Sequence, residues 1–489
     1  MDSGAYDIVI GLEIHAQLQT QTKLFCGCST AFGRLPNSLT CPVCLGLPGA
    51  LPVLNERAVE MAVMLALAVH ARIHLRSQFS RKNYFYPDLP KGYQITQYLY
   101  PIASDGWLSI EDSGTPRKIG IERLNLEEDA GKSIHDGLPD SARKTSLDFN
   151  RSGVPLVEIV GRPELTSPAQ AVEFLARLRT TVQYLEICDG NMEQGSLRCD
   201  ANLSVKKKGS AAMGVKTEIK NLNSFRFLER ALAFEAERQI GLLEQGLPVH
   251  AETRQYDAAQ NRTLPMRSKE EAQDYRYFPE PDLPLLVFGE DLIAALGARL
   301  PELPEAKIRR FIAAYGLPAY EAGLLAESRE LGDYFERTAA ASASPRQASH
   351  WIMREVRQYL NDRRETVDRY PVRPESLGEL IRLVENGEIT LTAAKEKVLP
   401  LRIASGRSAP EIVREEGLAQ ISDEAEIKRL ALRILEENPG PLRQYREGKK
   451  QVFGFFVGRL MKASAGRADA RTAQEVFKAL LAADEKKSS

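Results

Sequence analysis

Four cysteines near the start of the chain have the spacing of a zinc site. Cys26 and Cys28 form one close pair, and Cys41 and Cys44 form a second pair after twelve intervening residues. Two close pairs of thiolates supply the four ligands that tetrahedral zinc requires, and the polar, turn-rich segment between them suits a metal-binding loop. Because a four-cysteine site leaves no open position for substrate, we expect a structural zinc; the alternative is four buried free cysteines.

An acidic run precedes a tripeptide that resembles the end of a phosphate-binding loop. The tripeptide Gly-Lys-Ser at 131–133 resembles the end of a P-loop, but Leu126 stands where that loop requires its first glycine. Residues 127–129, Glu-Glu-Asp, lead into the tripeptide instead. This composition favours a divalent cation that carries phosphate, and it leaves Lys132 as a candidate phosphate contact.

Further candidate ligands lie on polar faces of predicted strands. Glu13 and His15 are two residues apart in an alternating segment, so their side chains lie side by side on one face. Asp200 shares the polar face of a second such segment with Arg198. Magnesium needs few protein carboxylates beside water and phosphate oxygens, so these groups would suffice if the fold brings them together. The alternatives are solvated strand edges and a histidine satisfied by its neighbours.

Residues 80–97, SRKNYFYPDLPKGYQITQ, combine tyrosines with lysines and glycines. Aromatic rings beside basic groups suit stacking on a base or ribose and contact with phosphates, and Lys82 is the candidate cation. A packed aromatic loop is the alternative.

A basic segment lies near the end of the chain. Residues 443–471 contain eight lysines and arginines against two acidic residues. In a chain of almost neutral net charge, this local excess indicates a surface for an RNA backbone. The alternative is an amphipathic helix with a solvated basic face.

The elements that must position these residues change in type along the chain. Alternating segments at 8–17, 197–205 and 215–220 predict antiparallel strands with one polar face. Helices are predicted at 55–69, at 166–185, with Ser167 as N-cap and Gln170 completing a capping box, and at 224–246. From about residue 301 almost only amphipathic helices follow, and the break near 404 divides them into two modules.

Composition is that of a soluble globular protein. The chain has 489 residues, 43% of them hydrophobic, with 65 basic and 66 acidic side chains, which allows two to four domains. No signal peptide or membrane-spanning segment is evident, and the clustered cysteines do not suggest disulfides. We therefore expect a cytoplasmic protein that does not associate with membranes.

Several segments, in order along the chain, resemble the B subunits of the glutamyl/aspartyl-tRNA amidotransferases. They are GLEIHAQL, CPVCLGLPG, RKNYFYPDLPKGYQITQ, LEEDAGKS, DFNRSGVPLVEIV, GSLRCDANLS, KNLNSFRF and RSKEEAQDYRYFPEPDLP. The likeness is close through residues 6–286 and looser beyond. GRADA at 466–470 departs from the usual family sequence, and the cysteine set is a feature of only part of the family.

The resemblance implies an α+β fold with three regions. Residues 1–295 would form a cradle-like catalytic domain with a largely antiparallel sheet and the zinc loop 26–44. Residues 296–405 would form a helical domain, and 406–489 a helical, tRNA-binding tail.

The implied activity belongs to a heterotrimer. A partner amidase (the A chain of the enzyme) would release ammonia from glutamine, and a small third chain (C) would brace the assembly. This chain would use ATP and magnesium to phosphorylate the side-chain carboxylate of Glu-tRNA(Gln), Asp-tRNA(Asn) or both. Ammonia would then displace phosphate, so that the enzyme is a carbon–nitrogen ligase with glutamine as amido donor.

The resemblance also implies roles for individual residues. Glu128 would be the first magnesium ligand, with catalytic roles also for Glu13 and His15. The full expected magnesium set is Glu13, His15, Glu127, Glu128 and Asp200.

The remaining assignments concern phosphates and tRNA. Lys82, Lys132 and Arg198 would contact ATP or its phosphates. Arg443, Lys449, Lys450 and Arg459 would contact tRNA.

Two other classes of function are weighed against this one. A non-catalytic, zinc-stabilised RNA-binding protein would keep the cysteines and the basic tail but would not need carboxylates on polar strand faces. A free-standing ligase of small metabolites would not need the basic helical third.

Overall fold

The computed structural model describes residues 3–112, 114–135, 137, 141, 143–268, 274–421 and 423–487. The chain divides into two compact units, one ending at Pro304 and the other beginning at Glu305. The first unit contains the sheets and the helices packed on them, whereas the regular elements described in the second unit are helices. The predicted α+β fold with a helical C-terminal part is therefore confirmed.

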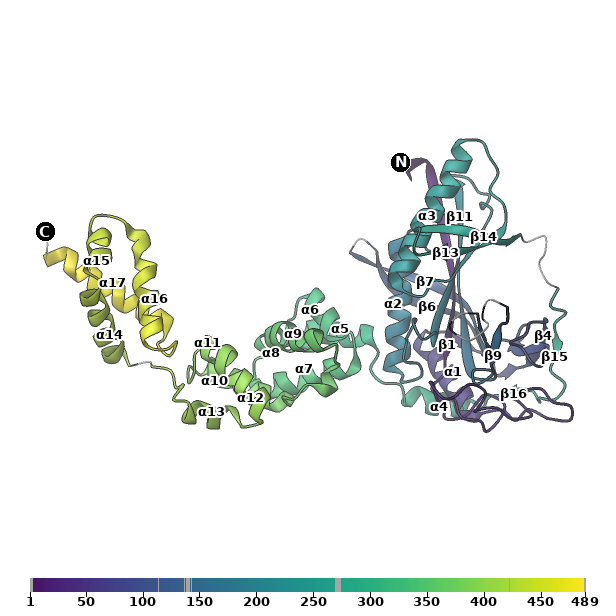
Figure 1. The fold of residues 1–489 in the computed structure, drawn as a ribbon, viewed down its shortest axis with the longest axis horizontal. Helices are drawn as coiled ribbons and strands as arrows, with labels where there is room; N and C mark the ends of the chain where they lie inside the picture. Colours follow the sequence, from purple (N-terminus) through teal and green to yellow (C-terminus); the bar gives the residue numbers. More distant parts are fainter. Residues whose placement is uncertain are drawn as a thin grey trace. The chain divides into compact units, whose positions relative to one another are not determined.

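A nine-stranded sheet forms the centre of the first unit (Figure 1). All of its pairings are antiparallel except that between β12 and β13. The long strand β1 lies between β10 and β11, so its side chains meet neighbours on both sides. In sheet order the strands are β14 (Arg262–Ser268), β13 (Glu252–Asp257), β12 (Thr217–Lys220), β11 (Leu197–Lys207), β1 (Tyr6–Gln17), β10 (Pro155–Gly161), β7 (Thr115–Glu128), β6 (Ala103–Asp112) and β2 (Arg72–Ile73).

One face of this sheet is the hydrophobic core. Ile10, Leu12, Ile14 and Ala16 of β1 are fully or almost fully buried, as the alternating pattern predicts. The helices α1 (Glu56–Ala68), α2 (Pro168–Tyr184) and α3 (Phe225–Glu244) pack on the sheet, and α2 and α3 also contact each other. The opposite face is left for polar side chains.

Local signals set the ends of these helices. Ser167 caps α2 by accepting a hydrogen bond from the Gln170 N–H at 3.2 Å, and Pro168 takes the first helical position. The predicted capping box does not form as expected, because the Gln170 side chain accepts from the N–H of Thr166 at 2.9 Å. Ser224 caps α3 in the same way as Ser167 caps α2.

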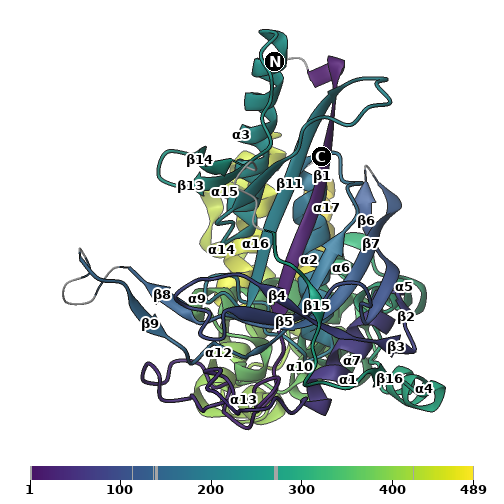
Figure 2. The ribbon, with the colours of Figure 1, turned by 90° about the vertical axis from the view of Figure 1, so that its right-hand side faces the viewer.

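Three small sheets accompany the large one. The strands β15 (Phe278–Pro279), β4 (Phe79–Asn83) and β5 (Tyr93–Gln97) form one sheet that crosses the long strands β1 and β11 (Figure 2). β5 contacts β7, since Gln97 Oε1 accepts from the Leu126 N–H at 2.9 Å. Two further pairs are β16 (Leu286–Val287) with β3 (Arg76–Ser77), and β8 (Lys132–Ile134) with β9 (Ser146–Asp148).

The second unit contains two hydrophobic clusters. The first spans residues 311–418 and the second spans residues 427–481. The sequence-based domain boundary near 405 lies inside the first cluster, because Ala409, Ile412 and Leu418 are buried in it. The helix α4 (Glu290–Ala298) packs on α1 and belongs to the first unit, which therefore extends past the expected end at 295.

The helices described in the second unit range from 3 to 18 residues in length. The first cluster is built around α5 (Pro304–Tyr315), α6 (Ala319–Leu325), α7 (Arg329–Ser342), α8 (Pro345–Trp351), α9 (Arg357–Arg363), α10 (Pro374–Glu385), α11 (Leu391–Ala393), α12 (Leu399–Ser405) and α13 (Ala409–Glu415). The second is built around α14 (Glu424–Glu437), α15 (Pro439–Arg446), α16 (Phe453–Ala463) and α17 (Ala470–Lys487). Among the helices of the described residues, none is long and apolar enough to cross a membrane.

Candidate active site and metal centre

Cross-strand rows bring distant residues together on the polar face of the large sheet. On β1, the alternation places Glu13 and His15 on this face. His15 pairs with Glu158 of β10 on one side and with Arg198 of β11 on the other. Glu13 pairs with Asp200 of β11 in the next row. Strand register, rather than sequence proximity, thus assembles the site.

An acidic cluster surrounds the imidazole of His15. Its Nε2 lies 3.7 Å from Glu13 Oε1, 3.6 Å from Glu127 Oε1 and 3.9 Å from Glu158 Oε1. The ligand atoms of Glu13, His15 and Glu158 lie within 4.8 Å of one another, which is compatible with a shared divalent cation. We call Glu13, His15, Glu127 and Glu158 the acidic cluster.

Glu158 was missed by the sequence reasoning. It is a single acid in the apolar run VPLVEIV, which becomes strand β10. A lone charge inside an otherwise apolar strand is the one signal that could have found it, since such a charge must face a polar site.

Two glutamates of the cluster hold their protons more tightly than free side chains do, whereas His15 releases its proton more easily. Burial, with Glu158 close by, raises the pKa of Glu127 to about 8. Burial and the same neighbour raise the pKa of Glu13 to about 7. Burial lowers the pKa of His15 and so favours the neutral imidazole that can bind a metal. A bound cation would favour the ionised form of both glutamates and so would lower their pKa values.

Asp129 takes part in a different set of contacts. Its Oδ1 lies 3.1 Å from Arg198, and its Oδ2 accepts a 2.8 Å hydrogen bond from Gln17 and lies 3.6 Å from Arg151. Although burial opposes it, the two guanidinium groups hold the pKa of Asp129 below its ordinary value. Arg198, a predicted phosphate contact, is thus placed beside the cluster but is paired with Asp129.

Asp200 is also paired with a cation. Lys220 of β12 contacts Asp200 and lies 3.0 Å from Glu218 Oε1. Asp200 is therefore adjacent to Glu13 in the sheet, but its carboxylate is directed to Lys220 rather than to the group around His15.

Lys82 links the acidic cluster to a group of tyrosines. Burial would lower the pKa of Lys82, but the charge of Glu127 holds it above its ordinary value. The Lys82 ammonium lies 5.0 Å from the ring centroid of Tyr275. Tyr98, about half exposed, stacks on Tyr277 with ring centroids 4.1 Å apart. The predicted aromatic and basic surface of residues 80–97 is thus extended by tyrosines from 275–277.

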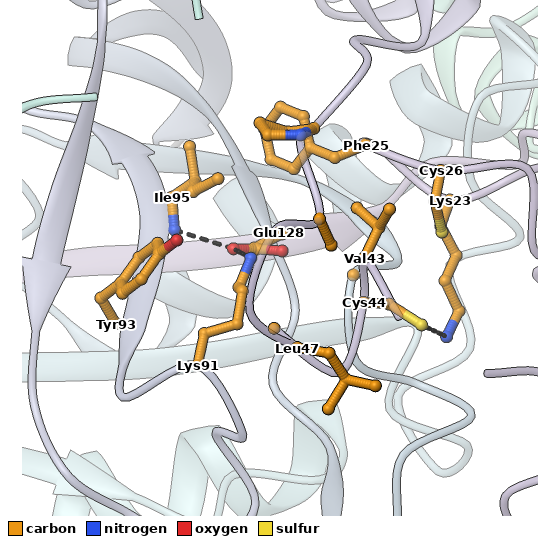
Figure 3. Close-up of a pocket in the computed structure, with 14 residues that line it drawn as sticks. Lys23, Phe25, Cys26, Val43, Cys44, Leu47, Lys91, Tyr93, Ile95 and Glu128 are labelled. Atoms are coloured by element: carbon orange, nitrogen blue, oxygen red, sulfur yellow. Dashed lines mark hydrogen bonds and ion pairs between the residues drawn. The ribbon is translucent and has the colours of Figure 1, made fainter. Parts of the chain in front are cut away.

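The structure directs Glu128 away from the acidic cluster. As the neighbour of Glu127 on β7, it faces the opposite side, where it is buried and paired with Lys91 (Figure 3). The Ile95 N–H donates to its Oε1 at 2.9 Å. These residues line a cavity of about 100 Å³ that also touches Cys44. Of the predicted magnesium ligands, Glu13, His15 and Glu127 come together, whereas Glu128 does not join them.

Lys132 lies outside the acidic cluster as well. It is exposed on strand β8. The preceding Gly131 donates its N–H to the Asp88 carbonyl oxygen at 2.8 Å, so this amide is not available to cradle a phosphate. The absence of a P-loop, inferred from Leu126, agrees with this arrangement.

The four cysteines of the predicted zinc loop converge. Their Sγ atoms all lie within 4.8 Å of one another, and those of Cys41 and Cys44 are 3.9 Å apart. A hydrogen bond from the Cys26 thiol lowers the pKa of Cys44 to about 4 and raises that of Cys26. A thiolate is the form that binds zinc, so the donor set fits the metal. The other two cysteines, Cys188 and Cys199, are buried in the core.

The predicted tRNA contacts are exposed in the second helical cluster. Arg443 lies on α15, Lys449 and Lys450 follow it, and Arg459 lies on α16. Lys450 lies 4.1 Å from the ring centroid of Tyr445, and Arg459 lies 5.3 Å from that of Phe455.

Fold and site together define an α+β domain with an acidic cluster whose geometry is compatible with a divalent cation, followed by helical modules. Comparison with known proteins gives the family. Residues 8–294 match the GatB/GatE catalytic domain, and residues 333–481 match the GatB domain.

Full-length relatives agree with these matches. A protein of Thermodesulfovibrio yellowstonii is 50% identical over 476 residues, which cover 97% of this chain and 99% of the relative. A protein of Chlorobium phaeobacteroides is 49% identical over 474 residues, with 97% and 99% covered. One of Halorhodospira halophila is 50% identical over 475 residues, with 97% and 98% covered. Each is named as the B subunit of an aspartyl/glutamyl-tRNA(Asn/Gln) amidotransferase.

The chain belongs to the GatB family, the B subunits of the tRNA-dependent amidotransferases. The resemblance inferred from the sequence segments is confirmed. The alternative of a non-catalytic RNA-binding protein has no support among these findings.

Proposed function

We propose that this chain phosphorylates the side-chain carboxylate of glutamate or aspartate misacylated on tRNA, with ATP as phosphoryl donor, and then converts it to the amide. The names of the relatives give the aminoacyl-tRNA substrates, and the acidic cluster is the observation that carries the chemistry. Three carboxylates from three strands of one sheet surround a neutral imidazole, beside cations that can contact phosphate.

The first step joins two anions. A side-chain carboxylate oxygen of the aminoacyl group attacks the γ-phosphorus of ATP, and the bond to the bridging oxygen breaks to release ADP. Mg²⁺ bound to Glu13, His15, Glu127 and Glu158 would neutralise the phosphate charge that otherwise repels the carboxylate. Lys82 supplies a further positive charge at the Glu127 side of the cluster.

The second step uses the acyl phosphate formed in the first. Ammonia attacks its carbonyl carbon, the C–O bond to phosphate breaks, and the amide remains on the tRNA with inorganic phosphate as the other product. We propose that a partner glutaminase, the amidase chain of the enzyme, supplies the ammonia and that a small third chain completes a heterotrimer, as the designation of the relatives as B subunits suggests.

The other predicted residues take supporting roles in this proposal. Arg198 holds Asp129 and orients the phosphate side of the site. Asp200 holds Lys220 beside Glu13. We propose no ligand role for Glu128; its pairing with Lys91 supports a role in joining β7 to β5.

Zinc and tRNA complete the proposal. The convergence of Cys26, Cys28, Cys41 and Cys44 supports one structural zinc. The exposure of four basic residues, two of them against aromatic rings, supports tRNA contacts by Arg443, Lys449, Lys450 and Arg459. For Lys132, exposed on β8, we keep the predicted role of a contact for ATP or its phosphates.

The test uses the complete enzyme with its partner chains. His15→Ala and Glu127→Gln should abolish ATP-dependent amidation at saturating Mg²⁺, while glutamine hydrolysis by the partner continues. Asn386→Ala, a change in the second unit, serves as a control. Amidation at the rate of the unchanged enzyme in either cluster variant would refute the proposal.

A further inference from the structure

Lys23 is a fully buried lysine beside the four cysteines of the zinc loop. Its ammonium donates to Cys44 Sγ at 3.5 Å (Figure 3) and to the Phe149 carbonyl oxygen at 3.2 Å. Among the described residues, no carboxylate forms an ion pair with Lys23. A buried ammonium without a negative partner is costly, and the thiolate of Cys44 is the anion that lies within its reach.

A second lysine in the lining of the same cavity has a different partner. Lys91 is paired with the buried carboxylate of Glu128, so its charge is balanced within the protein. Lys23 lines the cavity as well, but its ammonium contacts a sulfur atom instead of a carboxylate. Of these two buried cations, one is therefore balanced by an acidic side chain and the other is directed to the cysteines.

The backbone of Lys23 belongs to the zinc loop. Its N–H donates to the Cys28 carbonyl oxygen at 2.9 Å and closes the turn that carries the first cysteine pair. From another part of the chain, the Ser152 hydroxyl donates to the Cys44 carbonyl oxygen at 3.2 Å. Gly153, with a φ of +86°, lies so close that an added Cβ would be 3.4 Å from both Cys44 Cβ and Lys23 Cδ. These contacts fix the lysine side chain beside Cys44.

A zinc ion bound by four thiolates has an excess of negative charge around it, because the four sulfurs outweigh the two positive charges of the ion. Cys44 is the buried member of the set, whereas the other three cysteines are partly exposed. Water can solvate the charge on the exposed sulfurs, but the protein must balance it at Cys44. The Cys41 N–H, 3.2 Å from Cys44 Sγ, contributes a dipole, and Lys23 contributes a full positive charge.

We propose that Lys23 is the cation that balances the zinc site. It stabilises the Cys44 thiolate and so raises the affinity of the loop for zinc, as a positioning residue that does not itself bind the metal. Groups that hydrogen-bond to metal ligands typically change metal affinity by roughly 10- to 100-fold. The inference rests on the proposed function, because it requires the structural zinc proposed above.

The experiment measures the zinc affinity of the full chain by competition with a chromophoric chelator. Lys23→Met removes the ammonium but keeps an unbranched side chain, and Lys23→Gln keeps an N–H donor without the charge. Each should weaken zinc binding by at least about tenfold. The matched control is Lys91→Met/Glu128→Gln, which removes the other lysine of the cavity together with its partner and should leave the zinc affinity unchanged. If Lys23→Met does not fold, Lys23→Gln decides alone.

Substitution of cobalt for zinc gives a second readout that a loss of packing would not change. The energy of the sulfur-to-cobalt charge-transfer band depends on how firmly the sulfur atoms hold their electrons. Without the ammonium, the Cys44 sulfur gives up an electron more easily. The band should therefore move to longer wavelength in both Lys23 variants and stay in place in the control.

Different outcomes test the inference and the zinc site on which it rests. An unchanged zinc affinity in the Lys23 variants, or a weaker affinity with an unmoved cobalt band, would show that Lys23 only fills space, and the inference would be wrong. If the chain without substitutions binds no zinc, the structural zinc of the proposed function is itself wrong.

Discussion

Two adjacent glutamates should respond in opposite ways to the same substitution. Glu127 and Glu128 are neighbours on β7, yet one belongs to the acidic cluster and the other pairs with Lys91. In the protein without divalent metal at pH 7, we expect Glu127→Gln to raise the free energy of unfolding and Glu128→Gln to lower it.

The magnitude for Glu127 follows from its pKa. A change from 4.5 in the unfolded chain to about 8 in the folded one means that ionisation opposes folding. At pH 7 the carboxyl is ionised in the unfolded chain but mostly protonated in the folded one. Each pH unit above 4.5 lowers the free energy of unfolding by about 1.4 kcal/mol, so the loss at pH 7 is roughly 3 kcal/mol. Glutamine carries no charge and can still accept the 2.8 Å hydrogen bond from Thr96. The increase in the free energy of unfolding caused by Glu127→Gln should be absent below pH 4.5 and should grow as pH rises toward 8.

Glu128→Gln should lower the free energy of unfolding because it leaves a buried charge without a partner. The side chains of Glu128 and Lys91 are 3% and 7% exposed, so Glu128→Gln would leave the ammonium buried without its carboxylate. Breaking one partner of such a pair costs about 3 kcal/mol. The double variant Lys91→Met, Glu128→Gln should recover most of that loss, because an apolar replacement of both partners removes the buried charge.

Calorimetric unfolding of the purified chain, with divalent metals removed, measures these changes. The first unit contains both sites, so its transition is the one to compare. If both single variants shifted this transition in the same direction by similar amounts, the assignment of the two glutamates to opposite faces of β7 would be wrong.

The remaining predictions concern metals and tRNA. Because Mg²⁺ must displace protons from Glu13 (pKa about 7) and Glu127 (pKa about 8), the Mg²⁺-induced rise in Tm should be larger at pH 8 than at pH 6; a pH-independent shift would argue against this site. Elemental analysis should find one zinc per chain, lost in Cys41→Ser/Cys44→Ser together with thermal stability; full zinc in that variant would contradict the assignment. Removal of residues 423–489 should raise KM for misacylated tRNA and make KM less dependent on salt, while turnover falls much less. Steady-state amidation assays at two salt concentrations measure both effects. Loss of turnover at an unchanged KM would assign the second helical cluster to catalysis or folding.

Much of the fold was predictable because its patterns are local. Alternation along β1 correctly separates Glu13 and His15 from the buried face, and the cap at Ser167 marks the start of α2. The change to helices after residue 301 follows from periodicity alone. The convergence of the cysteines is also local, since all four lie within one short loop.

The acidic cluster was only partly predictable, because cross-strand register decides it. Alternation implies that Glu127 and Glu128 face opposite sides, but not which of them meets His15. That depends on the pairing of β7 with β10, which places Asn125 opposite Glu158, and of β10 with β1, which places Glu158 opposite His15. Residues 33 and 143 positions apart in the sequence thus become neighbours through hydrogen bonds that no local pattern encodes.

The acidic run that first suggested a cation site divides into three environments. Glu127 faces His15, Glu128 faces Lys91 on the reverse side, and Asp129, at the end of the strand, faces Arg198. Two of the three carboxylates thus have a lysine or arginine as partner.

The carboxylates of the acidic cluster differ from Glu128 and Asp129 in having no lysine or arginine as an ion-pair partner. Among the described residues, the carboxylates of Glu13, Glu127 and Glu158 lie 3.6 to 3.9 Å from His15 Nε2, and no lysine or arginine forms an ion pair with any of them. Burial makes ionisation of these carboxylates costly even with Lys82 nearby, as the raised pKa values of Glu13 and Glu127 indicate. Neighbouring acids such as Asp129 and Asp200 are neutralised by their own partners, so the unbalanced negative charge is confined to one point of the sheet. A divalent cation bound there would remove that cost and would lie close to Lys82, where the proposed reaction brings the γ-phosphate and the side-chain carboxylate together.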